Sequence, residues 1–273
     1  MDTTKILLSG ELQNLSQLPE TLHANKDRLM LLRQGHARSH DIDRQLACIL
    51  AAIAGALNTA AFHAVGFFSA NMTGNVSSLS DHAALGQWWV SLFYLAIVAV
   101  FILGGTASTL LINAGRRRTI RSIYAIGILA EAILMTALGV ALWLIPSIER
   151  GPVLILGLSF LMGIQNAVVT RISDARVRTT HVSGMSTDIG IEFGMLLDIM
   201  RGREPDAERA PYWNKLRLHV QTVLSFLAGG VAGVAIYQAI GTRLLFAAAI
   251  LLFAMAITAI VRARTQDGQM TMS

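Results

Sequence analysis

The chain has 273 residues, of which 53% are hydrophobic and 14% are charged. Soluble domains carry about 25% charged residues, so this composition disfavours a soluble protein and indicates a lipid environment. The net charge of +5 does not indicate a nucleic-acid partner, because the arginines sit in short clusters between apolar runs rather than in one basic stripe. Cys48 is the only cysteine, which excludes an intrachain disulfide and the Cys-based zinc sites.

The apolar residues gather into long runs after a polar start. Residues 1–45 have mixed charge and no apolar core followed by a cleavage site, so we expect a cytoplasmic N-terminal extension rather than a cleaved signal peptide. A membrane domain at 46–262 and a cytoplasmic tail at 263–273 follow. About 20 apolar residues cross a bilayer as a helix, and six stretches come close to this length. In chain order they are Leu46–Ala64, Trp88–Asn113, Ser122–Ile145, Pro152–Val169, Leu218–Ile240 and Leu244–Val261.

Lysine and arginine are sorted between alternate segments outside these stretches. Of the basic residues, 20 lie in the N-terminal segment, the second and fourth connections and the C-terminal segment, and 2 lie in the other connections. Basic loops stay on the cytoplasmic side of a membrane. The pattern therefore predicts a multi-pass protein of a bacterial inner membrane with both termini in the cytoplasm.

Three short motifs recur in the same order in the two halves of the membrane domain. The matched pairs are Gly55 with Gly163 and Asn58 with Asn166 (108 residues apart), Thr73-Gly74 with Ser183-Gly184 (110 apart), and Gly104-Gly105 with Gly229-Gly230 (125 apart). Because three spans is an odd number, the two halves must enter the membrane from opposite sides. We therefore expect an all-α membrane protein with six transmembrane helices, built as two inverted three-helix repeats at 46–145 and 152–262. Such repeats are common in transporters, with the site near the midplane.

The same motifs resemble a known family. Over about residues 44–262 the chain resembles the YoaK-type bacterial membrane proteins, which contain a domain of unknown function. The family typically has Gly-x-x-Asp-Ala where this chain has Asn58, so a protonation role of that aspartate does not carry over. The resemblance implies the fold and no particular substrate. Its segments are Gly55-x-x-Asn58-x-Ala60, Met72-Thr73-Gly74-Asn75, Gly163-Ile164-Gln165-Asn166-Ala167 and Thr179-Thr180-His181-Val182-Ser183-Gly184.

The polar glycine-containing segments supply the candidate site. We hypothesise that each repeat contributes a broken or re-entrant helix with Thr73 or Ser183 as its N-cap. Two converging N-termini would offer free N–H groups to a small polar or anionic solute, whereas a capped loop outside the hydrocarbon is the structural alternative. The amides equally suit hydrogen bonds between helices. The candidate substrate-binding residues are Asn58, Thr73, Gly74, Asn75, Gln165, Asn166, Ser183 and Gly184.

Carboxylates within or beside the spans are the other candidates. Glu131 lies nine residues into the third span, about 13 Å along a helix and near mid-membrane. It is a proton-coupling candidate, with a protonated, hydrogen-bonded carboxyl as the alternative. Asp188 and Glu192 share one helical face, for which a solvated surface beside Arg176 and Arg178 is favoured over cation or proton binding. No metal site and no cofactor are predicted.

The favoured function is a secondary transporter of a small polar or anionic solute, with its site between the repeats. A passive channel is the closest alternative. An integral membrane enzyme is disfavoured, because the His-Glu-x-x-His, Walker A and dinucleotide motifs are absent. A structural or regulatory role of the basic segment 170–217 also stays open. The expected partners are the lipid bilayer and a small solute, with no nucleic acid. The pattern Gly229-x-x-x-Gly233 suits packing within the chain or a homo-oligomer.

Overall fold

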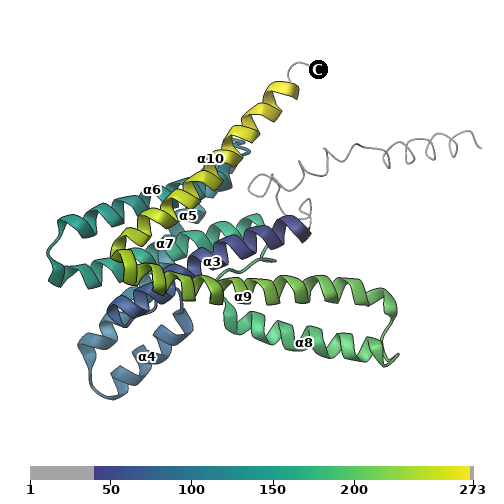
Figure 1. Cartoon of the computed structure of the whole chain (residues 1–273), viewed down its shortest axis with the longest axis horizontal. Helices are drawn as coiled ribbons and strands as arrows, with labels where there is room; N and C mark the ends of the chain where they lie inside the picture. Colours follow the sequence, from purple (N-terminus) through teal and green to yellow (C-terminus); the bar gives the residue numbers. More distant parts are fainter. Residues whose placement is uncertain (1–39, 271–273) are drawn as a thin grey trace, which may run out of the picture.

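A computed structural model describes residues 40–270, and in this range helices are joined by short connections (Figure 1). The three shortest helical pieces are single 3-10 turns, η3 (Ser147–Glu149), η4 (Asp206–Glu208) and η5 (Gly241–Arg243). The α-helices of the described residues are α3 (His40–Val65), α4 (Met72–Ala84), α5 (Trp88–Arg117), α6 (Ile123–Leu144), α7 (Arg150–Ile172), α8 (Val182–Met200), α9 (Arg209–Ile240) and α10 (Leu244–Met270).

The predicted terminal segments lie partly outside this range. Residues 1–39 and 271–273 fall outside the described part of the chain, so the predicted N-terminal extension is described only from His40. Helix α3 begins there, ahead of the predicted span start at Leu46. Helix α10 continues to Met270 and so includes most of the predicted tail.

Five helical segments of the described chain are long and apolar enough to cross a membrane. Four of them contain α3, α5, α6 and α7 and include the first four predicted spans. The fifth, Asp206–Ala263, contains both α9 and α10. These two helices are separated at Gly241, whose φ of 62° is a left-handed conformation that favours glycine at a helix end. The chain is therefore helical and has the apolar segments of a multi-pass membrane protein, while the count of six spans stays a prediction.

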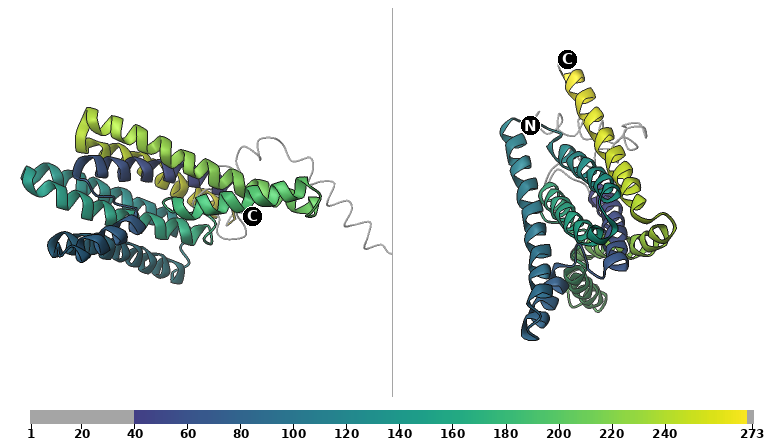
Figure 2. Two further views of the ribbon diagram at one scale, coloured as in Figure 1. Left: turned by 90° about the horizontal axis from the view of Figure 1, so that it is seen from below. Right: turned by 90° about the vertical axis from the view of Figure 1, so that its left-hand side faces the viewer.

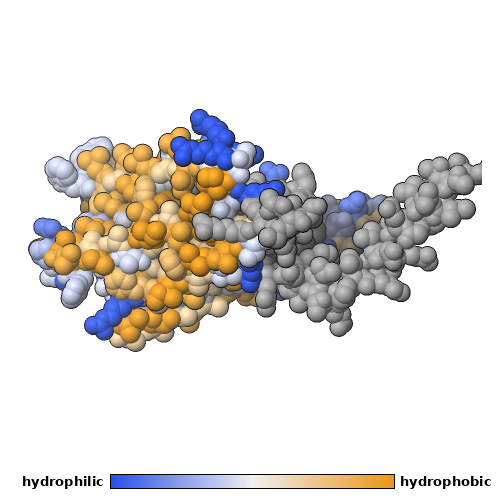
Figure 3. All heavy atoms as spheres, turned by 90° about the horizontal axis from the view of Figure 1, so that it is seen from above, coloured by the Kyte–Doolittle hydropathy of each residue, from blue (hydrophilic) through white to orange (hydrophobic). Residues whose placement is uncertain are grey.

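The outward faces of the long helices are apolar. Large side chains such as Ile102 on α5, Ile250 on α10 and Trp143 at the end of α6 are more than half exposed. Hydrophobic residues predominate across the middle of the face shown in Figure 3, with hydrophilic residues toward its rim. Soluble monomers rarely expose apolar patches of this extent. Contact with lipid tails accounts for such a surface.

The helices pack in matched pairs (Figures 1 and 2). Helix α3 packs along α9, α5 packs along α7, and α6 packs against α10. The two short helices lie on the same kind of partner, α4 on α5 and α8 on α9. Exchanging α3–α6 with α7–α10 leaves this set of pairs unchanged. Each half thus has the order long, short, long, long, and the short helix occupies the place where the sequence predicts a broken or re-entrant segment.

Glycines permit the closest contacts in these pairs. A Cβ atom at Gly55 would overlap the backbone carbonyl of Phe226, and one at Gly163 would overlap the carbonyl of Phe101. These contacts correspond, because their members are 108 and 125 residues apart. Small residues let helix backbones approach one another, so any side chain here would separate α3 from α9 or α5 from α7. A second matched set places Gly104 against Phe160 and Gly229 against Ala52.

Candidate functional site

The two short helices begin inside the bundle after equivalent connecting segments. Helix α4 starts at Met72 and α8 starts at Val182, 110 residues later. Residues 71–80 and 181–190 are exposed or buried alike at every position. The N-caps are Asn71, whose side chain accepts a hydrogen bond from the Gly74 amide at 3.1 Å, and His181. The prediction of Thr73 and Ser183 as N-caps is wrong, because each helix starts early enough to place them in its first turn.

Two asparagines tie these connecting segments to the long helices. The Ala70 amide donates to Oδ1 of Asn58 at 2.8 Å, and the hydroxyl of Thr180 donates to Oδ1 of Asn166 at 2.9 Å. Asn58 and Asn166 are the matched asparagines of α3 and α7. Each amide oxygen therefore fixes the start of one short helix against the helix that precedes it. Ser69 and Thr179, the next matched pair, are fully buried beside these contacts.

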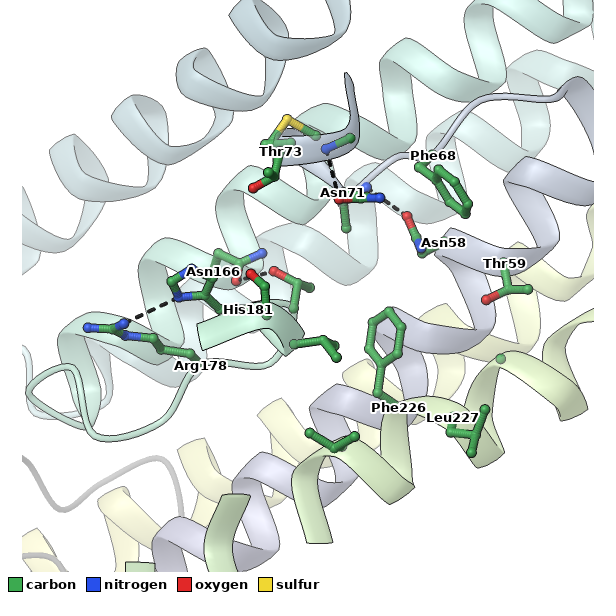
Figure 4. Close-up of a pocket in the computed structure, with 18 of the residues that line it drawn as sticks. Asn58, Thr59, Phe68, Asn71, Thr73, Asn166, Arg178, His181, Phe226 and Leu227 are labelled. Carbon is green, nitrogen blue, oxygen red and sulfur yellow. Dashed lines mark hydrogen bonds between the residues drawn. The ribbon is translucent and has the colours of Figure 1, made fainter. Parts of the chain in front are cut away.

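A cavity of about 1240 Å³ lies between the two connecting segments and the middle of α9 (Figure 4). Its volume suffices for a small organic molecule with some water. Five of the candidate residues from the sequence line it, and these are Asn58, Thr73, Gly74, Asn166 and Ser183. The apolar part of its wall includes Phe68, Phe101, Phe226, Leu227 and Val231.

One end of the cavity carries positive charge. Arg178 and His181 both line it, and Nη1 of Arg178 lies 3.2 Å from Nδ1 of His181. A guanidinium group only donates, so Nδ1 accepts this bond and Nε2 is left to donate. No aspartate or glutamate of the described chain lines the cavity. The free N–H groups at the starts of α4 and α8 add positive partial charge on the same side. The cavity therefore favours an anionic group over a cationic one.

The charge arises where the two halves differ in sequence. Phe68 holds the position that corresponds to Arg178, and Asn71 holds the position that corresponds to His181. The first half thus contributes an aromatic ring and an amide, and the second half contributes two groups able to donate to an anion. A solute that fits both ends would combine a negatively charged group with an apolar part.

Three candidate residues lie behind the cavity wall. The buried amide of Asn75 donates to the carbonyl oxygen of Phe68 at 2.9 Å, and that of Gln165 donates to the carbonyl oxygen of Leu50 at 3.0 Å. Gly184 lies under His181, where an added Cβ atom would come 3.0 Å from the imidazole ring. The bond of Gln165 joins α7 to α3, as the alternative of hydrogen bonding between helices expects. Substrate binding by these three residues stays a prediction.

Glu131 is buried in α6 and is not among the residues that line the cavity. Neither of its carboxylate oxygens has a hydrogen-bond partner among the described residues. A carboxylate is costly in such surroundings, which makes this side chain a functional candidate. A direct contact with a solute in the cavity is not available to it.

Glu192 departs from its predicted environment. The sequence favours a solvated face for it, but the residue is only 3% exposed, because α8 packs on α9 at this point. Its Oε1 atom lies 2.9 Å from Nδ1 of His219 on α9. Burial raises the pKa of Glu192, and the charge and hydrogen bond of His219 offset part of that rise. The corresponding residues of the first half are His82 and Tyr94, whose rings lie 5.5 Å apart.

Sequence reasoning missed the residues that give the cavity its charge. Arg178 counts there as a topology determinant, and His181 appears only within a family motif. Both follow from the repeat, because they lie 110 residues after Phe68 and Asn71, beside a segment already singled out. Phe226 is detectable in the same way as the match of Phe101.

Comparison with known proteins identifies a family but no characterised relative. A family model described as "Protein of unknown function (DUF1275)" matches residues 46–258. Searches of curated proteins and of solved structures find no match. The matched region begins near the start of α3 and ends within α10, and it includes every residue that lines the cavity. The chain belongs to this family of proteins of unknown function, DUF1275.

Proposed function

We propose that the protein is a secondary transporter of a small organic anion, which binds in the cavity between the two halves of the membrane domain. The observation that carries the proposal is a cavity formed by two equivalent segments, with Arg178 and His181 in its wall and no described carboxylate. The predicted setting is a bacterial inner membrane with both termini in the cytoplasm.

The matched contacts support an inverted repeat. Gly55 and Gly163 meet the backbones of Phe226 and Phe101, and each half has one short helix that starts at the cavity. If α9 and α10 each cross the membrane once, each half crosses three times and the halves run in opposite senses. Inverted repeats with a central site expose that site alternately to the two sides of a membrane. In this proposal the cavity is the alternately exposed site.

The polarity of the cavity supports an anion with an apolar part. A carboxylate near Arg178 would accept hydrogen bonds from the guanidinium group, which are strong because both partners are charged. The rings of Phe68, Phe101 and Phe226 would contact the hydrocarbon part. A cation would meet Arg178 without any acidic residue of the described cavity wall to balance it.

Two carboxylates are candidates for coupling transport to protons. Glu131 is buried in α6 without a hydrogen-bond partner in the described chain, and Glu192 forms an ion pair with His219 between α8 and α9. Neither residue lines the cavity. Coupling would therefore act through the positions of the helices: α8 begins at the cavity and α9 forms part of its wall.

Ligand-dependent stabilisation of the purified protein tests the anion site. Benzoate and its neutral amide, benzamide, have nearly the same shape, so they separate the effect of charge from that of size. A ligand that binds only the folded protein raises its apparent stability. We expect benzoate to raise the unfolding temperature more than benzamide, and Arg178→Gln to abolish the difference. Arg209→Gln, which removes an exposed arginine of α9 outside the cavity, is the control. Equal shifts by benzoate and benzamide would contradict the anion site.

Flux measurements separate the transporter from a channel. Proteoliposomes loaded with unlabelled benzoate are expected to accumulate labelled benzoate from outside by exchange, and the rate is expected to saturate. A proton gradient is expected to drive accumulation, and Glu131→Gln and Glu192→Gln identify which carboxyl couples it. Flux that rises linearly with concentration and shows no exchange would identify a channel instead.

A further inference from the structure

A second cavity, of about 910 Å³, lies at one end of the bundle, away from the candidate site. It is bounded by the end of α3, the connection between α6 and α7, and the turn between α9 and α10. Arg150 and Arg243 both line it. These are the only two basic residues outside the segments predicted to be cytoplasmic. Chain segments far apart in sequence thus bring both exceptions to the charge pattern to one cavity.

Both arginines have donors left for a ligand. Arg150 uses Nε to bond the carbonyl oxygen of Ile145 at 3.1 Å, which orients its guanidinium group. Its other nitrogens, and all of Arg243, form no hydrogen bond or ion pair with the residues described here. The wall adds hydroxyl groups from Ser147 and Thr242, and it contains no described carboxylate.

The remainder of this cavity suits the interface between headgroups and lipid tails. Trp143 and Ile148 line it and are 79% and 87% exposed. Tryptophan is enriched at the level of lipid headgroups. The wall therefore places two cationic groups and two hydroxyl groups next to an apolar surface that faces outward.

We infer that this cavity binds a phosphate group at the membrane surface opposite the basic loops. Two guanidinium groups can bind the oxygens of one phosphate through paired N–H donors. A phospholipid headgroup and free phosphate present the same chemistry, and the apolar side of the wall would add affinity only for the lipid. The inference concerns Arg150 and Arg243 and is independent of the anion proposed for the central cavity.

Native mass spectrometry of the delipidated protein tests the site. Dioleoyl phosphatidylglycerol is titrated against wild type, with dioleoylglycerol, which lacks the phosphate, as the matched probe. We expect wild type to bind the phospholipid and not dioleoylglycerol, and Arg150→Gln with Arg243→Gln to weaken the phospholipid binding at least about tenfold. Arg209→Gln with Arg217→Gln removes two exposed arginines of α9 and is expected to change nothing.

The outcomes separate the two sources of phosphate. Binding of glycerol phosphate as tight as that of the phospholipid assigns the site to a free anion, and tighter binding of the phospholipid assigns it to a lipid. Arg243→Gln alone is the variant least prone to disturb folding, because Arg243 makes no bond within the described chain. Equal phospholipid binding by wild type, the double variant and Arg243→Gln would overturn the inference. Loss of benzoate binding in Arg178→Gln alone would leave it unaffected.

Discussion

Replacing Gly55 by alanine tests the packing that forms the central cavity. The new Cβ atom would lie 2.9 Å from the carbonyl carbon of Phe226 and closer still to the oxygen. Carbon atoms in contact are separated by about 3.5 Å or more, so α3 and α9 must move apart by at least about 0.6 Å. Overpacking of this kind costs about 1–3 kcal/mol, against which alanine gains up to about 1 kcal/mol in helix propensity. We expect a net loss of about 1–2 kcal/mol in the free energy of unfolding.

The matched glycine makes this prediction sharper. Gly163→Ala would bring a Cβ atom to 3.0 Å from the carbonyl carbon of Phe101, between α5 and α7. Because the two contacts correspond, the two variants are expected to lose stability to a similar degree. Gly190→Ala is the control, since an added Cβ atom on α8 there meets no atom within 4 Å and should gain stability. Denaturant unfolding in detergent micelles measures all three. If Gly55→Ala proved as stable as Gly190→Ala, the close approach of α3 and α9 would be refuted.

Three further predictions address the candidate site, the polar pair and the topology. Asn58→Asp keeps an oxygen for the Ala70 amide and is expected to stay within about 1 kcal/mol of wild type, whereas Asn58→Leu leaves that amide unpaired and is expected to lose about 1–3 kcal/mol in denaturant unfolding. Glu192 lies on α8, outside the candidate spanning segments, and its pKa is raised on folding, so its contribution to stability is greatest below the ordinary carboxyl pKa, about 4.3, and is lost as the pH rises through the raised value. Wild type is therefore expected to lose stability relative to Glu192→Gln across that interval, and thermal unfolding from pH 4 to 7 checks this, with the exposed Glu204→Gln as control; parallel curves for all three would contradict it. Reporter fusions after Ser273 and within residues 201–208 are expected to show cytoplasmic locations, and opposite locations would refute the orientation.

The sequence predicts the long helices well because their signal is local. Runs of apolar residues identify the stretches that contain α3, α5, α6 and α7, and they separate α9 from α10 near Gly241. The predicted starts fall late where polar residues continue a helix beyond the apolar run. Helix α3 begins at His40 for this reason, and α9 begins at Arg209 rather than Leu218.

The candidate site was predictable only as far as the repeat reaches. Asn58 and Asn166 appear as a matched pair in the sequence, and both line the cavity. Gln165 has no matched amide, since Leu57 holds its position in the first half, and its side chain serves a contact between helices. The repeat thus separates cavity residues from other buried amides better than polarity alone.

Contacts between distant helices could not be predicted from local patterns. The spacing of Asp188 and Glu192 indicates a shared helical face but not what covers it. His219 lies 27 residues beyond Glu192, and only the packing of α8 on α9 brings the two together. The cavity lined by Arg150 and Arg243 is likewise formed by three separate connections.

Accessibility of the central cavity from the two sides of the membrane tests the proposed function most directly. With Cys48→Ser as background, Thr73→Cys and Ser183→Cys place single thiols at matched positions of the cavity wall. A membrane-impermeant maleimide is applied to right-side-out and to inverted vesicles. A transporter with an alternately exposed site predicts that both thiols react from both sides of the membrane. Reaction from one side only, whether or not benzoate is present, would contradict the proposal.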